Sequence, residues 1–224
     1  WLNSGDTTVE VQQQNEGGGE SGMTTKWTSE QGLPDIFFFQ GPTPHDVQKQ
    51  HANVVGPTLL PPLFSLGYHQ CRWNYRSEED TLEVDHGFEV HDIPYDVLWL
   101  DIEHTDGKRY FTWDKYNFPN PKQMVEKVAS KGRKMVTITD PHIKRDDNYH
   151  VHREATEKRL YVQTQSGSDF EGDCWPGRSS YIDFYNAEAR KWYATLFHYD
   201  RYPGSTPDLY SWIDMNEPSV FNAH

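Results

Sequence analysis

From residue 61 onward, short apolar runs alternate with segments of helical pattern, and this alternation constrains the fold more than any other feature. Each run has the length and the continuous apolarity of a strand that is covered on both faces. The order strand, helix, strand predicts an α/β fold with a parallel sheet, because crossover helices must connect the strands. The four strands are expected at residues 63–68, 97–100, 134–138 and 209–213.

The segments between these runs carry signals for helix starts. Ser77, Asn120 and Asn186 are residue types that cap helix N-termini, and each precedes a segment of helical pattern. Gly132 is expected to end the second of these helices. The segment 144–180 fits neither a strand pattern nor a helix pattern. We therefore expect an insertion there, after the third strand.

The first 56 residues differ in pattern and are assigned to a β-rich unit. Residues 12–22 are polar and rich in glycine, which predicts a flexible loop. Extended segments are expected at 22–28 and 36–39. A short connecting helix is expected at 44–54. The remaining residues, 57–224, form the alternating part of the chain.

Charge and composition exclude several classes of partner. The formal net charge is −13 at pH 7, from 34 acidic and 21 basic residues. This charge repels phosphate backbones and anionic lipid head groups, so we expect no nucleic-acid partner and no membrane-surface role. No apolar stretch approaches the roughly 20 residues that span a bilayer, so no membrane insertion is expected.

The sequence predicts neither a metal site nor a cofactor. Cys71 and Cys174 are too few for a disulfide framework and lack zinc-site spacing, so we expect two buried thiols. His142, His150 and His152 lie close together without the HExxH spacing of a zinc helix. No glycine-rich dinucleotide or phosphate-binding motif is present.

Polar side chains gather where the predicted strands end. His69 directly follows the first run, Asp101 and Glu103 the second, Asp140 the third and Asp214 the fourth. The carboxyl ends of parallel strands share one edge, and TIM barrels carry their catalytic groups there. A doubly wound open sheet also places its site at this edge. The pattern therefore predicts where a site lies and leaves these two topologies open.

Several carboxylates on one rim, with tryptophans close in sequence, suit the hydrolysis of a glycosidic bond. One ionised carboxylate attacks or stabilises the oxocarbenium-like centre, and a second, protonated one gives its proton to the leaving oxygen. The indole faces of Trp99, Trp175 and Trp212 offer apolar surface to a sugar ring. Carboxylate clusters also bind magnesium or calcium, and an Asp at a strand end is often only a helix cap. From these residues alone, the alternatives stay open.

Five motifs resemble glycoside hydrolase family 31 in their order and spacing. The last of them, WIDMNEPS at 212–219, is similar to the nucleophile motif of that family. The other four are PPLFSLGYHQ at 61–70, WLDIEH at 99–104, DPHIK at 140–144 and DCWPG at 173–177. The resemblance covers the chain from about residue 33 to its end.

The resemblance implies a fold and an activity. Residues 57–224 would be the first four β/α units, the first half of a (β/α)8 TIM barrel, preceded in residues 1–56 by the end of an N-terminal β-sandwich. Runs 107–114 and 167–172 are most similar to the catalytic α subunits of endoplasmic-reticulum α-glucosidases. The implied activity is removal of terminal α-linked glucose, with α-1,3 linkage, from N-glycan precursors on glycoproteins. The implied location is the endoplasmic-reticulum lumen, with a regulatory β subunit as partner.

The resemblance also implies roles for individual residues. Asp214 and Glu217 would be the catalytic residues, Asp214 as the nucleophile that forms a covalent glucosyl ester, with Glu217 orienting it or serving the structure alone. Asp101 would accept hydrogen bonds from glucose hydroxyls. Asp140 is expected to be structural rather than catalytic. The residues expected to wall the sugar pocket, each of which is also compatible with an ordinary core position, are Ile102, Ile138, Trp175, Trp212 and Met215.

The general acid/base of the family lies on a later barrel strand, beyond the motifs found here. Four strands cannot close a barrel and would leave a strand edge open. We therefore expect a fragment truncated at both ends, with a companion polypeptide that completes the barrel and supplies the acid/base. A non-catalytic carbohydrate-binding relative, an α-xylosidase and an α-glucan lyase stay open as alternatives.

Overall fold

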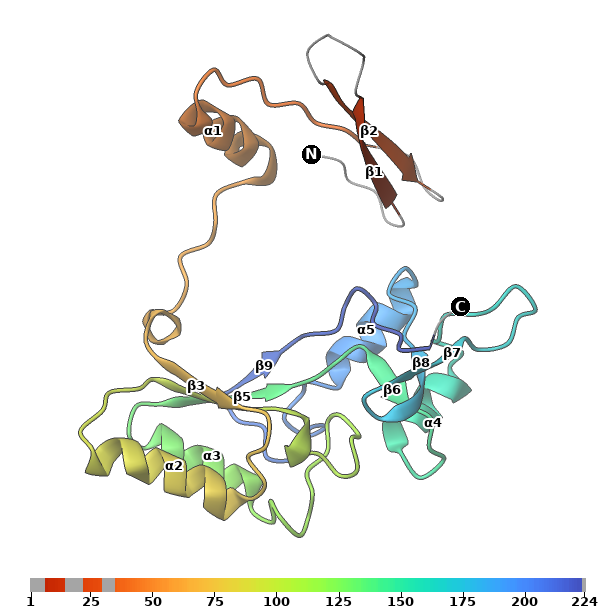
Figure 1. Cartoon of the computed structure of the whole chain (residues 1–224). Coiled ribbons are helices and arrows are strands. Elements are labelled where there is room, and N and C mark those ends of the chain that lie inside the picture. The colour runs from red at the N-terminus through yellow and green to blue at the C-terminus, as the bar shows by residue number, and fades with distance from the viewer. Residues whose placement is uncertain (1–6, 15–21, 30–34, 223–224) are drawn as a thin grey trace. The chain divides into compact units, whose positions relative to one another are not determined.

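The computed structural model describes residues 7–14, 22–29 and 35–222, and the chain divides into two units, Trp1–Leu60 and Pro61–His224 (Figure 1). The first unit contains a hairpin and a helix. Strands β1 (Thr7–Gln14) and β2 (Gly22–Ser29) pair antiparallel along their whole length. The ends of the predicted loop 12–22 therefore belong to these strands, and residues 15–21 lie outside the described residues.

The helix expected at 44–54 is confirmed as α1 (Pro44–Val55). It begins with a reciprocal capping box. The Asp46 backbone N–H donates to Thr43 Oγ1 at 3.2 Å, and the Thr43 backbone N–H donates to Asp46 Oδ2 at 3.2 Å. The strand expected at 36–39 is wrong, because the structure has only an isolated bridge at Ile36 there. A continuous apolar run specifies a strand only where a neighbouring strand pairs along it.

A four-stranded parallel sheet forms the centre of the second unit. The strands lie in the order β3-β4-β5-β9, which is also their order along the chain. A doubly wound sheet reverses its strand order at one point, whereas a barrel adds each new strand on the same side. The sheet therefore has the topology of part of a barrel. Its strands are β3 (His69–Arg72), β4 (Val97–Leu100), β5 (Lys134–Ile138) and β9 (Leu209–Trp212).

The first predicted strand, 63–68, is misplaced. Residues Leu63–Leu66 form the short 3-10 helix η1, and strand β3 begins only at His69. Two prolines, Pro61 and Pro62, precede the turn, and the Ser65 backbone N–H closes it by donating to Pro62 O at 3.0 Å. His69 therefore begins its strand and does not lie at the carboxyl end. The other three predicted strands are confirmed.

The three predicted helix starts are confirmed. The helices are α2 (Glu78–Val90), α3 (Pro121–Ala129) and α5 (Ala187–Thr195). Ser77 Oγ accepts the Asp80 backbone N–H at 3.0 Å, and Asn186 Oδ1 accepts the Glu188 backbone N–H at 2.9 Å. Asn120 holds the cap position of α3 without a side-chain cap hydrogen bond. Helices α2 and α3 lie side by side, and α3 packs against β5 (Figure 1).

Between β5 and β9 the chain forms a second, antiparallel sheet. Its order is β6-β8-β7, built from β6 (His142–Lys144), β7 (Glu171–Cys174) and β8 (Gly177–Tyr181), with helix α4 (His150–Glu157) beside β6. This sheet and helix lie in the segment where the sequence analysis recognised neither a strand pattern nor a helix pattern. The reason is that EGDC and GRSSY, the sequences of β7 and β8, contain too few apolar residues to show a strand period. We refer to residues 142–181 as the insertion.

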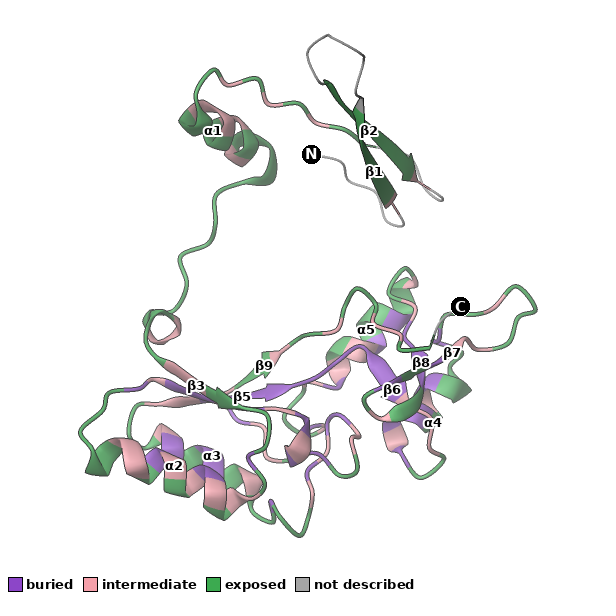
Figure 2. Cartoon of the chain, viewed as in Figure 1, coloured by how far each residue is buried: buried purple, intermediate pink, exposed green. Residues whose placement is uncertain are grey.

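The core of the second unit runs from the parallel sheet into the insertion. Figure 2 shows buried residues along β5 and β6, and Leu98 of β4, Met135 of β5 and Val128 of α3 are fully buried. Both cysteines are free thiols, and Cys174 is buried as predicted. The prediction is wrong for Cys71, which is exposed. Cys71 lies on β3, which among the described residues pairs with a strand on one side only.

Asp85 is a buried charge that ties α2 to the segments that precede β4 and β5. Its carboxylate accepts hydrogen bonds from Lys131 Nζ at 2.6 Å, from Arg133 Nη1 at 2.8 Å and from the Tyr95 hydroxyl. Burial favours the neutral acid, but these three donors outweigh burial and hold the pKa of Asp85 below its ordinary value. The ionised carboxylate is therefore part of the folded structure.

Replacing Asp85 with alanine is expected to lower the free energy of unfolding by about 3–5 kcal/mol, because a buried network of donors loses its acceptor. Urea unfolding of the protein measures this change. Glu83→Ala, on the exposed side of the same helix, is the matched control and is expected to change stability by no more than about 0.5 kcal/mol. Equal unfolding midpoints for the two variants would contradict the assignment.

Candidate functional site

A cavity of about 210 Å³ opens at the carboxyl ends of the parallel strands. It is smaller than the roughly 300–1,000 Å³ typical of pockets for drug-sized ligands, and so is matched to a single small ring. All four strands of the sheet deliver residues to it, either from their last position or from the turn that follows. The lining residues are Trp73, Asp101, Ile102, Ile138, Trp175, Trp212, Asp214 and Met215.

The structure brings together every predicted site residue except one. Asp101, Asp214 and all five predicted wall residues line this cavity, whereas Glu217 does not. The one lining residue that the sequence analysis missed is Trp73. It follows β3 directly, so the signal was present but was hidden by the misplaced first strand.

Backbone pairing places Asp214 beside the end of β5. The parallel ladder between β5 and β9 extends one residue past the end of β5, because the Thr139 backbone N–H donates to Trp212 O at 2.8 Å. Ile138 and Trp212 are register partners and both line the cavity. The chain then turns at Met215, which has a positive φ of 60°. Asp214 is exposed and lies directly before Met215, at the start of this turn.

Asp101 is half-buried at the end of β4. Its Oδ1 accepts the Ile102 backbone N–H at 2.6 Å, which caps the short 3-10 helix η2 (Ile102–His104). Burial is the main cause that raises the pKa of Asp101, the charges of Glu103 and Asp214 add to the rise, and the Ile102 N–H opposes it. A donor on a bound ligand would stabilise the ionised form of this carboxylate.

Indole rings make up much of the apolar surface of the cavity. The rings of Trp73 and Trp175 lie 6.2 Å apart between centroids. The Trp212 ring packs against the ring of Trp99, and the two ring centroids lie 5.4 Å apart. Trp99 Nε1 donates in turn to His69 Nδ1 at 2.8 Å. His69 therefore fixes a tryptophan that supports the cavity, and it does not line the cavity itself.

The segment that follows Asp214 is bound to the insertion. The Phe221 backbone N–H donates to Asp173 O at 2.8 Å, and the Asp173 backbone N–H donates to Asn222 Oδ1 at 2.7 Å. Tyr181 contributes a third contact, since its hydroxyl donates to Ser219 O at 2.8 Å. Strands β7 and β8 of the insertion therefore hold the turn that carries Asp214.

Gly172 lets this segment approach β7 closely. A Cβ atom at this position would lie 2.7 Å from Val220 Cγ1, which is shorter than a van der Waals contact allows. The absence of a side chain at Gly172 is therefore required for the segment after Asp214 to dock on β7.

Gly172→Ala is expected to lower the free energy of unfolding by about 1–3 kcal/mol, because it overpacks this contact. Gly87→Ala is the matched control: Gly87 lies in α2 with open space around its Cβ position, so alanine is expected to stabilise the protein by about 0.5–1 kcal/mol. Chemical unfolding of both variants measures the difference. A stabilising Gly172→Ala would contradict the close docking.

Asp140 is fully buried and does not line the cavity. The Tyr110 hydroxyl donates to Asp140 Oδ2 at 2.5 Å and lies 3.1 Å from His142 Nε2. Burial is the main cause that raises the pKa of Asp140 to about 7; the Tyr110 hydrogen bond opposes the rise, and nearby carboxylates, Asp214 foremost, add to it. Burial also lowers the pKa of His142 to about 4, so this histidine is neutral near pH 7.

The raised pKa of Asp140 links stability to pH. The folded value of about 7 exceeds the ordinary 3.8, so between these pH values the unfolded carboxyl loses its proton and the folded one keeps it. The contribution to stability is therefore fully present below about pH 4 and is lost as the pH rises to about 7. An asparagine side chain cannot ionise, so Asp140→Asn removes this pH-dependent loss of stability. Its amide oxygen can still accept the hydrogen bond from the Tyr110 hydroxyl.

The melting temperature of Asp140→Asn relative to the parent protein is expected to rise between pH 4 and pH 7 and to level off above pH 8. The gain at pH 8 corresponds to about 4 kcal/mol, because the folded and ordinary pKa values of Asp140 differ by about 3 units. Asp147→Asn, at an exposed position, controls for the substitution itself. A gain for Asp140→Asn that does not change with pH would contradict the raised pKa.

Two further findings concern metals and membranes. Within residues 7–14, 22–29 and 35–222, no three His, Cys, Asp or Glu side chains are arranged to hold a metal ion. In the same described ranges, no helix combines the length and the apolarity needed to cross a membrane.

Residues 58–224 match the TIM-barrel domain of glycosyl hydrolases family 31, and the chain belongs to this family. The chain is 59% identical over 222 residues to neutral alpha-glucosidase AB of Dictyostelium discoideum, an alignment that covers 99% of the chain and 23% of that relative. It is 58% identical over 231 residues to a probable glucan 1,3-alpha-glucosidase of Arabidopsis thaliana, covering 99% of the chain and 25% of the relative.

Solved structures have the same fold. A crystal structure of an ER glucosidase II heterodimeric complex, consisting of the catalytic subunit and the binding domain of the regulatory subunit, matches 99% of this chain with a TM-score of 0.85 and 47% identity. The match covers 25% of that structure's chain, so this chain spans about a quarter of the length of such relatives. The expected partial TIM barrel and the resemblance to the catalytic α subunit of glucosidase II are both confirmed.

Proposed function

We propose that this chain forms part of the active site of a retaining α-glucosidase, with the terminal glucose bound in the 210 Å³ cavity. The observation that carries the proposal is the convergence of Asp214 and Asp101 with three tryptophans in a space of this size. The relatives support it, since proteins 58–59% identical to the chain bear the names of α-glucosidases.

In this proposal Asp214 is the nucleophile. Its carboxylate attacks the anomeric carbon, the bond to the leaving oxygen breaks, and a covalent glucosyl ester forms. Water then cleaves the ester and restores the carboxylate. Asp214 is exposed in the segment that follows β9. This exposure supports the role, because the attacking carboxylate oxygen must be accessible to the substrate.

Asp101 is proposed to bind glucose hydroxyls. Burial and neighbouring carboxylates disfavour its ionised form, and hydroxyl donors of a bound sugar would offset both effects. Ile102, Ile138 and Met215 would exclude water from the ring. Glu217 lies outside the cavity, and in the described residues no hydrogen bond joins its side chain to that of Asp214. We therefore propose that Glu217 takes no direct part in the reaction and serves the structure alone.

The general acid/base is proposed to come from a companion segment that supplies the remaining barrel strands. Within the described residues, β3 and β9 each pair with a strand of the parallel sheet on one side only, which supports this idea. We call the chain together with this segment the assembled enzyme. By analogy with the heterodimeric relative, a regulatory β subunit is proposed as a further partner.

The proposed substrate is the terminal α-1,3-linked glucose of N-glycan precursors on glycoproteins, and the proposed compartment is the endoplasmic-reticulum lumen. The support comes from relatives: one is named a glucan 1,3-alpha-glucosidase, and others are structures of an ER glucosidase II.

The test uses 5-fluoro-α-glucosyl fluoride, because fluoride departs without help from an acid. After exposure of the assembled enzyme, mass spectrometry is expected to find one fluoroglucosyl group on the peptide that contains Asp214. Asp214→Ala is expected to abolish the adduct and to lower kcat for an aryl α-glucoside by about 10⁴-fold or more. Asp200→Ala, at an exposed position outside the cavity, is the control. This variant is expected to form the adduct and to keep the kcat of the parent enzyme.

Other outcomes would identify a different protein. Sugar binding without adduct or turnover would indicate a non-catalytic carbohydrate-binding relative. An adduct formed from the corresponding xylosyl fluoride but not from the glucosyl compound would indicate an α-xylosidase. An elimination product in place of free glucose would indicate an α-glucan lyase.

A further inference from the structure

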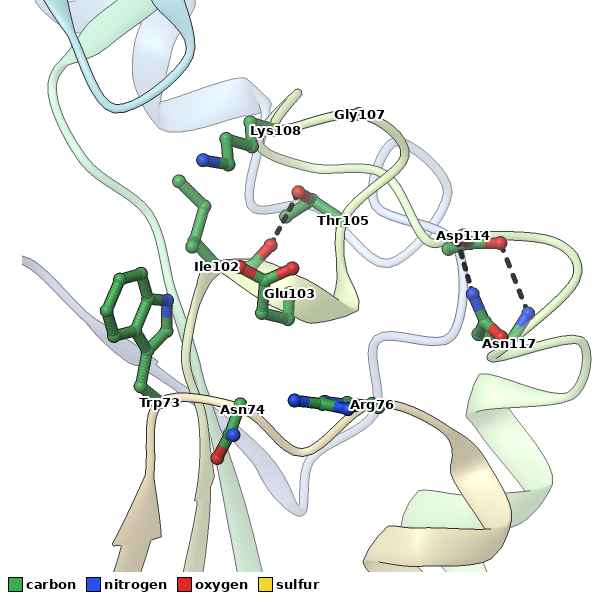
Figure 3. A pocket seen from close by; sticks show the side chains of 10 residues that line it. All are labelled: Trp73, Asn74, Arg76, Ile102, Glu103, Thr105, Gly107, Lys108, Asp114 and Asn117. Carbon is green, nitrogen blue, oxygen red and sulfur yellow. Dashed lines mark hydrogen bonds between the residues drawn. The ribbon is translucent and has the colours of Figure 1, made fainter.

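Several fully buried polar side chains form a cluster at the carboxyl end of β5. Its members are Tyr110, Thr139, Asp140 and His142. The cluster lies outside the cavity of about 210 Å³, and outside the larger cavity of about 720 Å³ that shares Trp73 and Ile102 with it (Figure 3). A group at this place influences a reaction at Asp214 only through another residue.

The strand register places Asp140 beside Asp214. Ile138 of β5 and Trp212 of β9 are register partners, and each is followed two residues later by an aspartate. The hydrogen bond from the Thr139 N–H to Trp212 O continues the pairing up to the residue before Asp140. Asp140 is therefore the buried neighbour of the exposed nucleophile. Burial is the main cause of its raised pKa, and among the neighbouring charges that of Asp214 contributes most.

The other titratable groups that interact with Asp140 do not hold its charge in place. They are Asp101, Glu217, His142, Cys174 and Tyr193. The two carboxylates add to the repulsion, and the thiol and the phenol are neutral near pH 7 because burial raises the pKa of both. Within the described ranges, no lysine or arginine forms an ion pair with Asp140. Its protonation therefore responds to the charge of Asp214.

Tyr110 connects Asp140 to His142. Its hydroxyl oxygen lies 2.5 Å from Asp140 Oδ2 and 3.1 Å from His142 Nε2. When Asp140 is ionised, this hydroxyl donates to Oδ2 and accepts the Nε2–H of the neutral imidazole. When Asp140 is protonated, its carboxyl donates to the hydroxyl, the hydroxyl donates to Nε2, and the ring carries its proton on Nδ1. The two states therefore differ in the tautomer of His142.

The hydrogen-bonded chain ends at buried atoms that have no partner among the described residues. They are Thr139 Oγ1, Asp140 Oδ1 and His142 Nδ1. Buried polar atoms of this kind are suited to bind an ordered water molecule. A proton can then leave Asp140 by three linked transfers. It passes from Oδ2 to the Tyr110 oxygen, the Tyr110 proton passes to Nε2, and the Nδ1 proton of His142 passes to water.

We propose that Asp140, Tyr110 and His142 form a proton relay that responds to the charge of Asp214 during the reaction. The inference rests on the proposed function, since it requires Asp214 to be the nucleophile. While Asp214 is a carboxylate, repulsion keeps the proton on Asp140. In the glucosyl ester Asp214 carries no charge, so the relay releases the proton to water, and hydrolysis of the ester draws it back. Asp140 is thus a positioning residue that does not touch the substrate.

The released proton can be counted. Attack of Asp214 on 5-fluoro-α-glucosyl fluoride expels fluoride and by itself neither consumes nor releases a proton. A pH indicator in a stopped-flow experiment therefore detects only protons from groups that respond to the lost charge. Near pH 6.5 the assembled parent enzyme is expected to release about 0.2 proton or more per adduct in excess of Asp140→Asn, and the excess is expected to vanish at about pH 9. Asp147→Asn, at an exposed position, is expected to match the parent.

The route of the proton is tested by Tyr110→Phe, which keeps the ring and removes the hydroxyl between Asp140 and His142. Proton release in this variant is expected to lag behind adduct formation by about tenfold or more. The matched control is Tyr161→Phe, which removes another buried tyrosine hydroxyl, 2.8 Å from His152 Nδ1. In the control, release is expected to keep pace with adduct formation. Release that also keeps pace in Tyr110→Phe would overturn the relay.

Hydrolysis of the ester gives a second measurement, since recovery of activity after removal of the reagent reports this step alone. An ionised Asp140 opposes the charge that returns to Asp214, so hydrolysis slows as Asp140 loses its proton. The rate constant of Asp140→Asn divided by that of the parent is expected to rise about threefold or more up to about pH 7 and to level off above it. A ratio that does not change with pH would show a purely structural Asp140 and overturn the proposal.

The outcomes separate this inference from the proposed function. If no adduct forms on Asp214 in the parent enzyme, the proposed function fails and the relay fails with it. If the adduct forms but the parent and Asp140→Asn release the same number of protons at every pH, the relay alone is overturned.

Discussion

The site depends on one interaction above all, the parallel pairing of β5 with β9. β9 comes about seventy residues after β5 in the chain, yet its backbone pairs with β5 up to the Thr139 to Trp212 hydrogen bond. Without this ladder, Asp214 would not lie on the rim that carries Asp101. The ladder also brings Ile138 beside Trp212, and with them the apolar wall of the smaller cavity.

The insertion between these two strands has a structural role in the site. It binds the segment after Asp214 through Asp173 and Tyr181, and Gly172 permits the close contact with Val220. The turn that carries the proposed nucleophile is therefore held from both ends, by the ladder before it and by β7 and β8 after it. Such support limits the positions that the Asp214 carboxylate can adopt.

Prediction from the sequence succeeded where the signals are local. Helix caps at Ser77 and Asn186 depend on hydrogen bonds within a few residues, and three of the four strands are short apolar runs bounded by polar groups. It failed at 63–68, where an apolar run follows two prolines and forms a turn. That shift hid Trp73, the lining residue that the sequence analysis did not find.

The sequence by itself determined which residues stand at strand ends, because apolar periodicity and capping are properties of neighbouring residues. It also carried the family motifs that name Asp214 and Asp101. Only the tertiary structure decided that Asp140 is buried with a raised pKa, that Glu217 lies outside the cavity, and that Tyr110 connects Asp140 to His142. These properties depend on contacts between segments far apart in the chain, and no local pattern encodes them.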